Sequence, residues 1–205
     1  PREIILNQSL EGKRVIEQAL IESQNKRTKI KDRVVSYRAK WLKISVANAE
    51  ESLKSKLASK ASISNQLTGL TQALGSKQKL SDLVCFDVSH HMGDKSVAAC
   101  VRLNEEGFSK KDYRRFNIEG VTPGDDYAAI SNAVQRYYKR IKNESQDCPD
   151  LLIIDGGKGQ INSVKKVLES LSIKNQTIIG IAKGDKRDPK NDRIFLEGFK
   201  KPIDM

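Results

Sequence analysis

The sequence predicts an α/β protein, a mixed sheet with flanking helices that is preceded by a small α+β segment with a long helix. Three observations predict this class. Three strand-like segments follow one another with short glycine turns between them, which is typical of an antiparallel meander. The run DLLIID (150–155) is apolar on both faces, as expected of a central parallel strand. Segments with the helical spacing of apolar residues lie before and after that run.

The first 80 residues predict two short strands and two helices. EIIL and KRVIEQALIESQ predict a strand and an amphipathic helix, and TKIKDRVVSY predicts a return to strand. From about Trp41, apolar residues recur at three- and four-residue steps, which predicts one long helix or two nearly collinear helices. Gly75 is placed to end this helical region. We therefore expect residues 1–80 to form a basic N-terminal segment with a long helix.

Residues 81–205 follow a different order of elements. Strands are predicted at LVCFDVS, SVAACVRLN, KKDYRRFNI, DLLIID, QTIIGIAKG and RIFLEG, and helices after TPGDD and at GQINSVKKVLESL. Asp125 is the expected N-cap of the first of these helices. Three antiparallel strands, a helix, a parallel strand and a helix are the layout of the ribonuclease-H-like fold. We expect that fold for residues 81–205, incomplete at its C-terminal end.

Positive charge is concentrated in the N-terminal part. The net charge is +11, and residues 1–80 hold 16 Lys and Arg against 7 Asp and Glu, while residues 81–205 hold 21 against 19. A basic surface attracts polyanions such as nucleic acid by releasing condensed counterions. The alternative is a solvated basic face without a dedicated partner.

Other features of the composition indicate a cytoplasmic protein that does not enter a membrane. No apolar run approaches the roughly 20 residues of a membrane-spanning helix, and the first residues lack the pattern of a secretory signal. The three cysteines are scattered and form no CxxC pair, so disulfides are not expected.

Three aspartates stand inside or at the tip of predicted elements rather than on polar surfaces: Asp87 in the first strand of the second part, Asp126 in the first turn of the helix, and Asp155 at the end of the central strand. If they converge, they form an oxygen-only site that suits Mg²⁺ or Mn²⁺. Such metals serve phosphodiester hydrolysis. Taken singly, each has a structural explanation: a favourable helix N-terminus, a turn, or a lysine partner.

Several basic residues are candidates for DNA contacts. Arg114 and Arg115 lie between two aromatic residues in YRRF and offer phosphate contacts, although cross-strand packing explains them equally well. Lys158 and Lys183 follow consecutive central strands and are placed to face one crevice, with solvated lysines as the alternative. GGKGQ lacks the spacing of a P-loop, so its glycines favour a tight strand-to-helix turn over nucleotide binding.

Four motifs carry a resemblance to a known family: CFDVSHHMGDKSVAACV, YRRFNIEGVTPGDDYAAI, PDLLIIDGGKGQ and GIAKG. In this order and spacing they resemble the C-terminal half of the UvrC family, the nuclease subunits of bacterial UvrABC nucleotide excision repair. The resemblance implies a ribonuclease-H-like endonuclease that makes the 5′ incision at a lesion in damaged double-stranded DNA. It also implies that Asp87, Asp126 and Asp155 hold the catalytic metal, Mg²⁺ or Mn²⁺, and that UvrB, or the UvrA–UvrB complex, is the partner of the full-length protein.

The chain also departs from the family pattern. The catalytic histidine of a downstream family motif, the helix-hairpin-helix repeats, the GIY-YIG nuclease and the UvrB-binding segment have no counterpart in this sequence, and the two histidines present, His90 and His91, belong to the SHHMG turn. We therefore expect a piece of a longer protein that cuts DNA weakly or not at all. The alternative is a non-catalytic DNA- or partner-binding module, which the basic first 80 residues favour.

Overall fold

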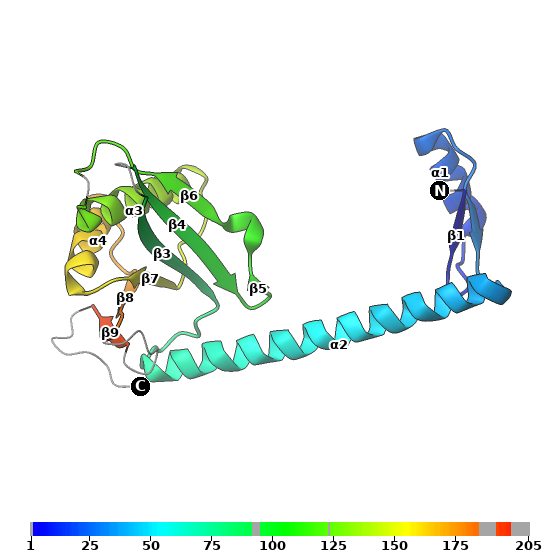
Figure 1. Ribbon diagram of the computed structural model, residues 1–205, viewed down its shortest axis with the longest axis horizontal. Coiled ribbons are helices and arrows are strands. Elements are labelled where there is room, and N and C mark those ends of the chain that lie inside the picture. Colours follow the sequence, from blue (N-terminus) through cyan, green and yellow to red (C-terminus); the bar gives the residue numbers. More distant parts are fainter. Residues whose placement is uncertain (1, 92–94, 123, 185–191, 198–205) are drawn as a thin grey trace. The chain divides into compact units, whose positions relative to one another are not determined.

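The computed structural model describes residues 2–91, 95–122, 124–184 and 192–197 (Figure 1). The chain divides into two compact units, residues 1–59 and residues 60–205, and the boundary falls within helix α2 (Ser36–Ala73). The prediction placed this boundary at residue 80.

The N-terminal unit contains a two-stranded parallel sheet and a helix that connects its strands. The elements are β1 (Glu3–Ile5), α1 (Lys13–Gln24) and β2 (Lys29–Lys31), and the register pairs Ile4 with Ile30. Glu17 of α1 accepts a hydrogen bond from the Ile30 amide at 2.6 Å, which ties the helix to the sheet. The predicted strand, amphipathic helix and strand are thus confirmed, with the second strand only three residues long.

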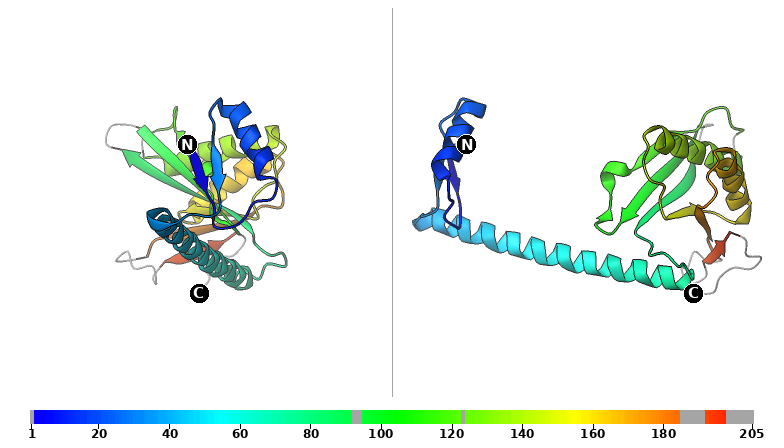
Figure 2. Two further views of the ribbon diagram at one scale, coloured as in Figure 1. Left: turned by 90° about the vertical axis from the view of Figure 1, so that its right-hand side faces the viewer. Right: turned by 180° about the vertical axis from the view of Figure 1, so that it is seen from behind.

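Helix α2 settles the choice between one long helix and two. It runs without interruption from Ser36 to Ala73, as the two further views in Figure 2 show. Gly75, with a φ of 60°, follows its end and confirms the predicted glycine stop. Within the described ranges, no helix is both long enough and apolar enough to cross a membrane.

The second unit is built on a seven-stranded mixed sheet. Its strand order is β5-β4-β3-β7-β8-β9, with β6 also paired to β4. The strands are β3 (Asp82–His91), β4 (Lys95–Asn104), β5 (Gly107–Phe108), β6 (Arg114–Asn117), β7 (Leu151–Asp155), β8 (Thr177–Ala182) and β9 (Arg193–Leu196), and the helices are α3 (Asp126–Asn143) and α4 (Lys158–Ser170). The pairs β3–β7 and β7–β8 are parallel, whereas β3–β4, β4–β6 and β8–β9 are antiparallel. The predicted fold class is confirmed.

One predicted strand was wrong in its first half. KKDYRRFNI forms a strand only from Arg114 onward, because Lys110–Asp112 form a short 3-10 turn, η1. The hydroxyl of Ser109 donates to the Asp112 carboxylate at 2.5 Å, which closes this turn.

Helices α3 and α4 cover one face of the sheet. The core between them contains Phe86, Leu152 and Ile154 from the strands, and Val134 and Val164 from the helices. The Phe86 ring meets the Tyr137 ring edge-on, with centroids 5.4 Å apart. These side chains are fully or almost fully buried, and their burial contributes to the stability of the sheet–helix layer.

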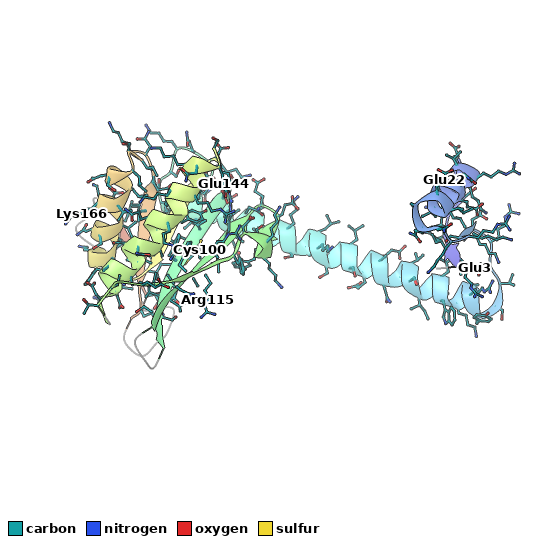
Figure 3. The ribbon with its side chains drawn as sticks, turned by 90° about the horizontal axis from the view of Figure 1, so that it is seen from above. Glu3, Glu22, Cys100, Arg115, Glu144 and Lys166 are labelled. Carbon is teal, nitrogen blue, oxygen red and sulfur yellow. The ribbon has the colours of Figure 1, made fainter. Side chains whose placement is uncertain are left out.

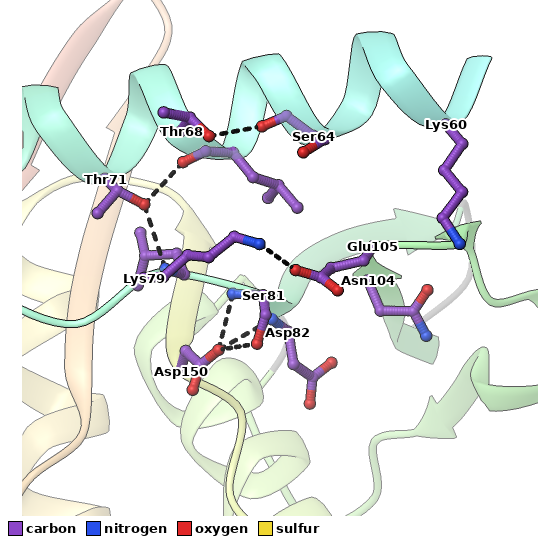
Figure 4. A network of polar contacts seen from close by, with 12 residues as sticks. Lys60, Ser64, Thr68, Thr71, Lys79, Ser81, Asp82, Asn104, Glu105 and Asp150 are labelled. Atoms are coloured by element: carbon purple, nitrogen blue, oxygen red, sulfur yellow. Dashed lines mark hydrogen bonds and ion pairs between the residues drawn. The ribbon is translucent and has the colours of Figure 1, made fainter. Parts of the chain in front are cut away.

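The C-terminal part of α2, residues 60–73, covers part of the opposite face. Leu67 is 2% exposed and packs with Leu83, Leu151 and Ile179. Figure 4 shows the polar contacts around this layer: the Thr71 hydroxyl accepts from the Leu80 amide at 3.1 Å, and Lys79 pairs with Glu105. The face is thus covered near the start of β3. Towards the end of β3 it carries the side chains considered next.

Candidate active site

Asp87 and Asp155 occupy neighbouring positions on adjacent parallel strands. The register of β3 and β7 pairs Phe86 with Ile154, and each aspartate is the next residue of its strand. Neighbouring strands lie about 4.8 Å apart, and alternation turns both carboxylates to the same face, away from α3 and α4. The site therefore lies at the carboxyl end of β7, beside the middle of the longer strand β3. Open α/β sheets commonly place their ligands where parallel strands end.

Both carboxylates affect the pKa of a nearby thiol, that of Cys85. Cys85 precedes Asp87 by two residues and shares its face of the sheet. Burial above all, with added repulsion from Asp155 and Asp87, raises the pKa of Cys85 to about 11. The two negative charges thus act on one small region of this face.

Asp87 is half-buried, but its apolar sequence neighbours do not enclose it. Phe86 and Val88 belong to the core under α3, whereas Asp87 points to the other face. The Ser89 hydroxyl, on the same side of the strand, donates to Asp87 Oδ2 at 3.4 Å. The apolar residues next to Asp87 in the sequence therefore do not surround its carboxylate, because alternate strand residues point to opposite faces.

Asp155 is paired with a lysine that directly follows the next strand, β8. Lys183 Nζ lies 2.9 Å from Asp155 Oδ2, and the Asp155 side chain is 27% exposed. The register of β7 and β8 pairs Asp155 with Ile181, so Lys183 follows two residues later on the same face. This places a positive charge directly on one of the two adjacent carboxylates.

Asp126 comes from the first turn of α3. Asp125 is the N-cap of that helix and accepts from the Ala128 amide at 2.9 Å, which confirms the predicted cap. Tyr127 reaches the start of α4, since a Cβ on Gly159 would lie 2.4 Å from Tyr127 Cε1. The helix that carries Asp126 thus begins beside the turn that follows Asp155.

The glycines after Asp155 permit close packing within the chain. A Cβ on Gly156 would lie 1.2 Å from Gln160 Oε1, and a Cβ on Gly180 would lie 2.5 Å from the carbonyl oxygen of Gly156. The interpretation of GGKGQ as a tight strand-to-helix turn is therefore supported. Sequence reasoning missed Gly180, whose role depends on the pairing of β7 with β8.

The side chains in their present positions supply only part of the oxygen ligands that Mg²⁺ or Mn²⁺ needs. Carboxylate oxygens are the ligands that Mg²⁺ and Mn²⁺ prefer, and Asp87 and Asp155 supply them side by side. Within the described part of the chain, however, no three Asp, Glu, His or Cys side chains form a group that could hold a metal ion. The side chains of His90 and His91 lie outside the described residues.

The structure separates the basic candidates. Arg115 pairs with Ala99, which pairs with Asp87, so all three share one face of the sheet. Arg114 points to the other face, and its guanidinium donates to the carbonyls of Lys111 and Tyr113, both at 2.8 Å. Lys158, at the start of α4, places its ammonium 5.4 Å from the centre of the Phe195 ring. Arg115 and Lys183 are thus the two predicted basic residues on the Asp87 face.

Solved structures show partial similarity to the chain. Ciona intestinalis Endonuclease V in complex with an inosine-containing DNA matches with a TM-score of 0.40 at 22% identity, over 62% of this chain and 53% of that one. Human ENDOV matches with a TM-score of 0.39 at 16% identity, over 51% and 46%. At TM-scores below 0.5 the similarity says nothing about what this chain does.

Sequence comparisons identify close relatives along the whole chain. "UvrABC system protein C" of Chromohalobacter salexigens is 41% identical over 197 residues, which are 96% of this chain and 33% of that protein. The protein of the same name from Methylococcus capsulatus is 43% identical over 203 residues, which are 99% and 33%. The chain therefore spans about a third of the length of these relatives.

Family models cover both units. Residues 1–56 match the model described as UvrC Ribonuclease H-like domain. Residues 71–205 match the model described as UvrC RNAse H endonuclease domain, which agrees with the resemblance carried by the four motifs. The chain belongs to the UvrC RNase H endonuclease domain family.

Proposed function

We propose that this chain is the part of a nucleotide-excision-repair nuclease that hydrolyses a phosphodiester bond on the 5′ side of a DNA lesion. One observation carries the proposal: Asp87 and Asp155 each follow the last registered pair of two adjacent parallel strands, Phe86 with Ile154, and so lie next to each other. Two adjacent carboxylates repel each other and a DNA phosphate, and Lys183 offsets the charge of Asp155 alone, so the arrangement favours a further cation. Membership of a nuclease-domain family supports the same conclusion.

In this proposal Asp87 and Asp155 hold Mg²⁺ or Mn²⁺, and Asp126 supplies a further oxygen from the start of α3. When bound, the metal would activate a water molecule and stabilise charge on the phosphoryl and leaving oxygens. Ser89 orients the Asp87 carboxylate through its hydrogen bond. Lys183 keeps the Asp155 carboxylate in place and adds positive charge for the incoming phosphate.

Contacts to DNA are proposed for the basic residues of this region. Arg115 and Lys183 lie on the Asp87 face and are the main candidates. Lys158 and Arg114, directed at Phe195 and at two backbone carbonyls respectively, are secondary candidates. In the full-length protein, damaged double-stranded DNA is the proposed substrate, and UvrB or the UvrA–UvrB complex is the proposed partner that delivers it.

We expect the 205-residue chain to bind the metal but to cut DNA weakly or not at all. Its only histidines are His90 and His91, and neither matches the family motif that supplies the catalytic histidine. Metal binding is therefore the sharper measurement on this chain.

The test is calorimetric titration of the chain with Mn²⁺. We expect Asp87→Asn to weaken Mn²⁺ binding at least about tenfold, because it removes one of two adjacent anionic ligands. Asp147→Asn is the matched control, since Asp147 is exposed and lies in the loop before β7. Unchanged Mn²⁺ affinity in Asp87→Asn, with normal thermal unfolding, would refute the site.

A second candidate function is DNA or partner binding by the N-terminal unit. Residues 1–59 carry 13 Lys and Arg against 7 Asp and Glu. A groove of about 980 Å³ beside the start of α2 is lined by Arg33, Arg38 and Lys43 among others. Tyr37 and Trp41 nearby are largely exposed, with ring centroids 5.0 Å apart.

The two candidates differ in their need for metal. Binding through a basic surface weakens steeply with salt and requires no divalent ion. DNA affinity measured with and without Mn²⁺ over a salt series distinguishes them: an affinity that is independent of Mn²⁺ and lost on charge removal in residues 33–43 supports the second candidate.

A further inference from the structure

Three residues on neighbouring strands form a row that leads away from Asp87. The β3–β4 register pairs Asp87 with Ala99, and the β4–β6 register pairs Ala99 with Arg115. Directly paired residues point to the same face of a sheet. Two strand spacings of about 4.8 Å separate the backbone of Arg115 from that of Asp87, so the row is about 10 Å long.

Ala99 leaves the middle of this row open. It is exposed, whereas its neighbours Ala98 and Cys100 are buried on the opposite face. A methyl group rises little above the sheet, so a ligand that spans from Asp87 to Arg115 would pass over it without obstruction. A larger side chain at this position would fill the space between the carboxylate and the guanidinium.

The YRRF segment divides between the two faces with the period of a strand. Phe116 packs against the Phe86 ring, with centroids 6.1 Å apart, and Arg114 shares its side. Arg115 is directed to the other face. Tyr113 lies just before the strand with an extended backbone and is 37% exposed. Figure 3 labels Arg115 on β6 with its side chain projecting from the ribbon. Arg115 is therefore available to a ligand on the Asp87 face, and Tyr113 is an exposed aromatic residue beside it.

The charge of Arg115 is not matched within the described part of the chain, where no residue forms an ion pair with it. Two other arginines of this unit form ion pairs: Arg102 binds Asp82 and Arg140 binds Glu144. A guanidinium presents a fork of donors that suits a phosphate group.

We propose that Tyr113, Ala99 and Arg115 form a track for the sugar–phosphate backbone of DNA that ends at Asp87. Arg115 binds a phosphate next to the one at Asp87, Ala99 is the floor between them, and Tyr113 contacts the adjoining sugar or base. The proposal rests on the proposed function, in which Asp87 belongs to the active site. It assigns the phosphate contact to Arg115 and not to Arg114.

The test is the affinity of the 205-residue chain for a fluorescein-labelled DNA duplex in EDTA over a series of KCl concentrations. We expect Arg115→Ala to weaken binding roughly fivefold and to reduce the slope of log affinity against log salt by about 0.9, the value of one phosphate contact. Arg115→Lys should retain the slope. Lys166→Ala is the charge-matched control, since Lys166 is exposed on α4, away from the Asp87 face.

A second variant tests the floor of the track without changing charge. Ala99→Leu should weaken DNA binding to a similar degree while its thermal unfolding matches that of the unmodified chain, because the added atoms extend towards solvent. Ala99→Ser, which keeps the side chain small, should bind normally.

Two results would overturn the track: an unchanged salt slope in Arg115→Ala, or an equal loss in Arg114→Ala. The proposed function is tested apart from it, by Mn²⁺ titration without DNA. If Arg115→Ala loses DNA affinity while Asp87→Asn binds Mn²⁺ normally, the DNA track is supported and the metal site is refuted. If Arg115→Ala binds DNA normally while Asp87→Asn loses Mn²⁺ affinity, the metal site is supported and the track is refuted.

Discussion

Lys183 donates a hydrogen bond to Asp155 at 2.9 Å, so a cationic side chain already occupies one of the two adjacent carboxylates. A divalent cation at Asp155 would compete with this ammonium group. Because the Lys183 side chain is 66% exposed, its ion pair is screened by water and contributes little to stability. The competition should therefore be measurable without loss of the fold.

We expect Lys183→Gln to tighten Mn²⁺ binding about two- to fivefold, because the substitution removes a competing positive charge. DNA affinity in EDTA should fall in the same variant, since a charge that attracts phosphate is lost. Calorimetry and fluorescence anisotropy measure the two effects. Their opposite signs separate this outcome from partial unfolding, and Lys166→Gln should change neither; weaker Mn²⁺ binding in Lys183→Gln would contradict the competition.

Leu67 and Leu57 offer a matched pair within one helix. Leu67 is buried against the sheet, whereas Leu57, ten residues earlier on α2, is 59% exposed. We expect Leu67→Ala to lower the free energy of unfolding by about 2–5 kcal/mol and Leu57→Ala to change it by less than about 0.5 kcal/mol. Urea denaturation measures both. Similar effects in the two variants would show that the end of α2 does not pack on the sheet in solution.

Local signals in the sequence predicted most elements, because their causes are local. Residues 13–24 have the apolar spacing of one helical face, and α1 has these bounds. Asp125 precedes a helical run and is the N-cap of α3, with its carboxylate on the Ala128 amide. Neither inference required knowledge of what lies across the sheet.

The arrangement of the site depends on strand register, which the sequence does not display. Arg114 and Arg115 are neighbours in the chain but face opposite sides of the sheet, and only the pairing of β6 with β4 shows which of them shares the Asp87 face. Ala99 has no functional group that would single it out in the sequence. Its position between Asp87 and Arg115 follows from the β3–β4 and β4–β6 registers. Phe86 and Val88 point to the opposite face from Asp87 because side chains alternate along a strand, and the predicted strand at LVCFDVS already implies this alternation.

Gly180 is predicted to fix the position of the turn after Asp155. A Cβ there would lie 2.5 Å from the Gly156 carbonyl oxygen and 2.7 Å from Ile161 Cδ1, and the first of these is a backbone atom. We expect Gly180→Ala to lower the free energy of unfolding by about 1–3 kcal/mol and to weaken Mn²⁺ binding, because the turn must shift. Gly69→Ala, in a helix with open space around it, should instead raise stability by about 0.5–1 kcal/mol. Thermal unfolding and Mn²⁺ titration of both variants measure these effects, and normal stability in Gly180→Ala would contradict the close approach.

Cys85 is expected to report on the charge of the two aspartates. Its pKa of about 11 keeps the thiol protonated and poorly reactive near neutral pH, since the thiolate is the nucleophile. Burial is the larger cause, and repulsion from Asp155 and Asp87 adds to it. Asp87→Asn removes one negative charge, so the pKa of Cys85 should fall and its alkylation by iodoacetamide should become faster. Peptide mapping by mass spectrometry over a pH series measures this rate, with Cys148 as the internal standard because it is exposed and its pKa is raised by burial and Asp147 alone. If Asp87→Asn leaves the alkylation rate of Cys85 unchanged while Cys148 reacts as before, the charge of Asp87 does not act on Cys85.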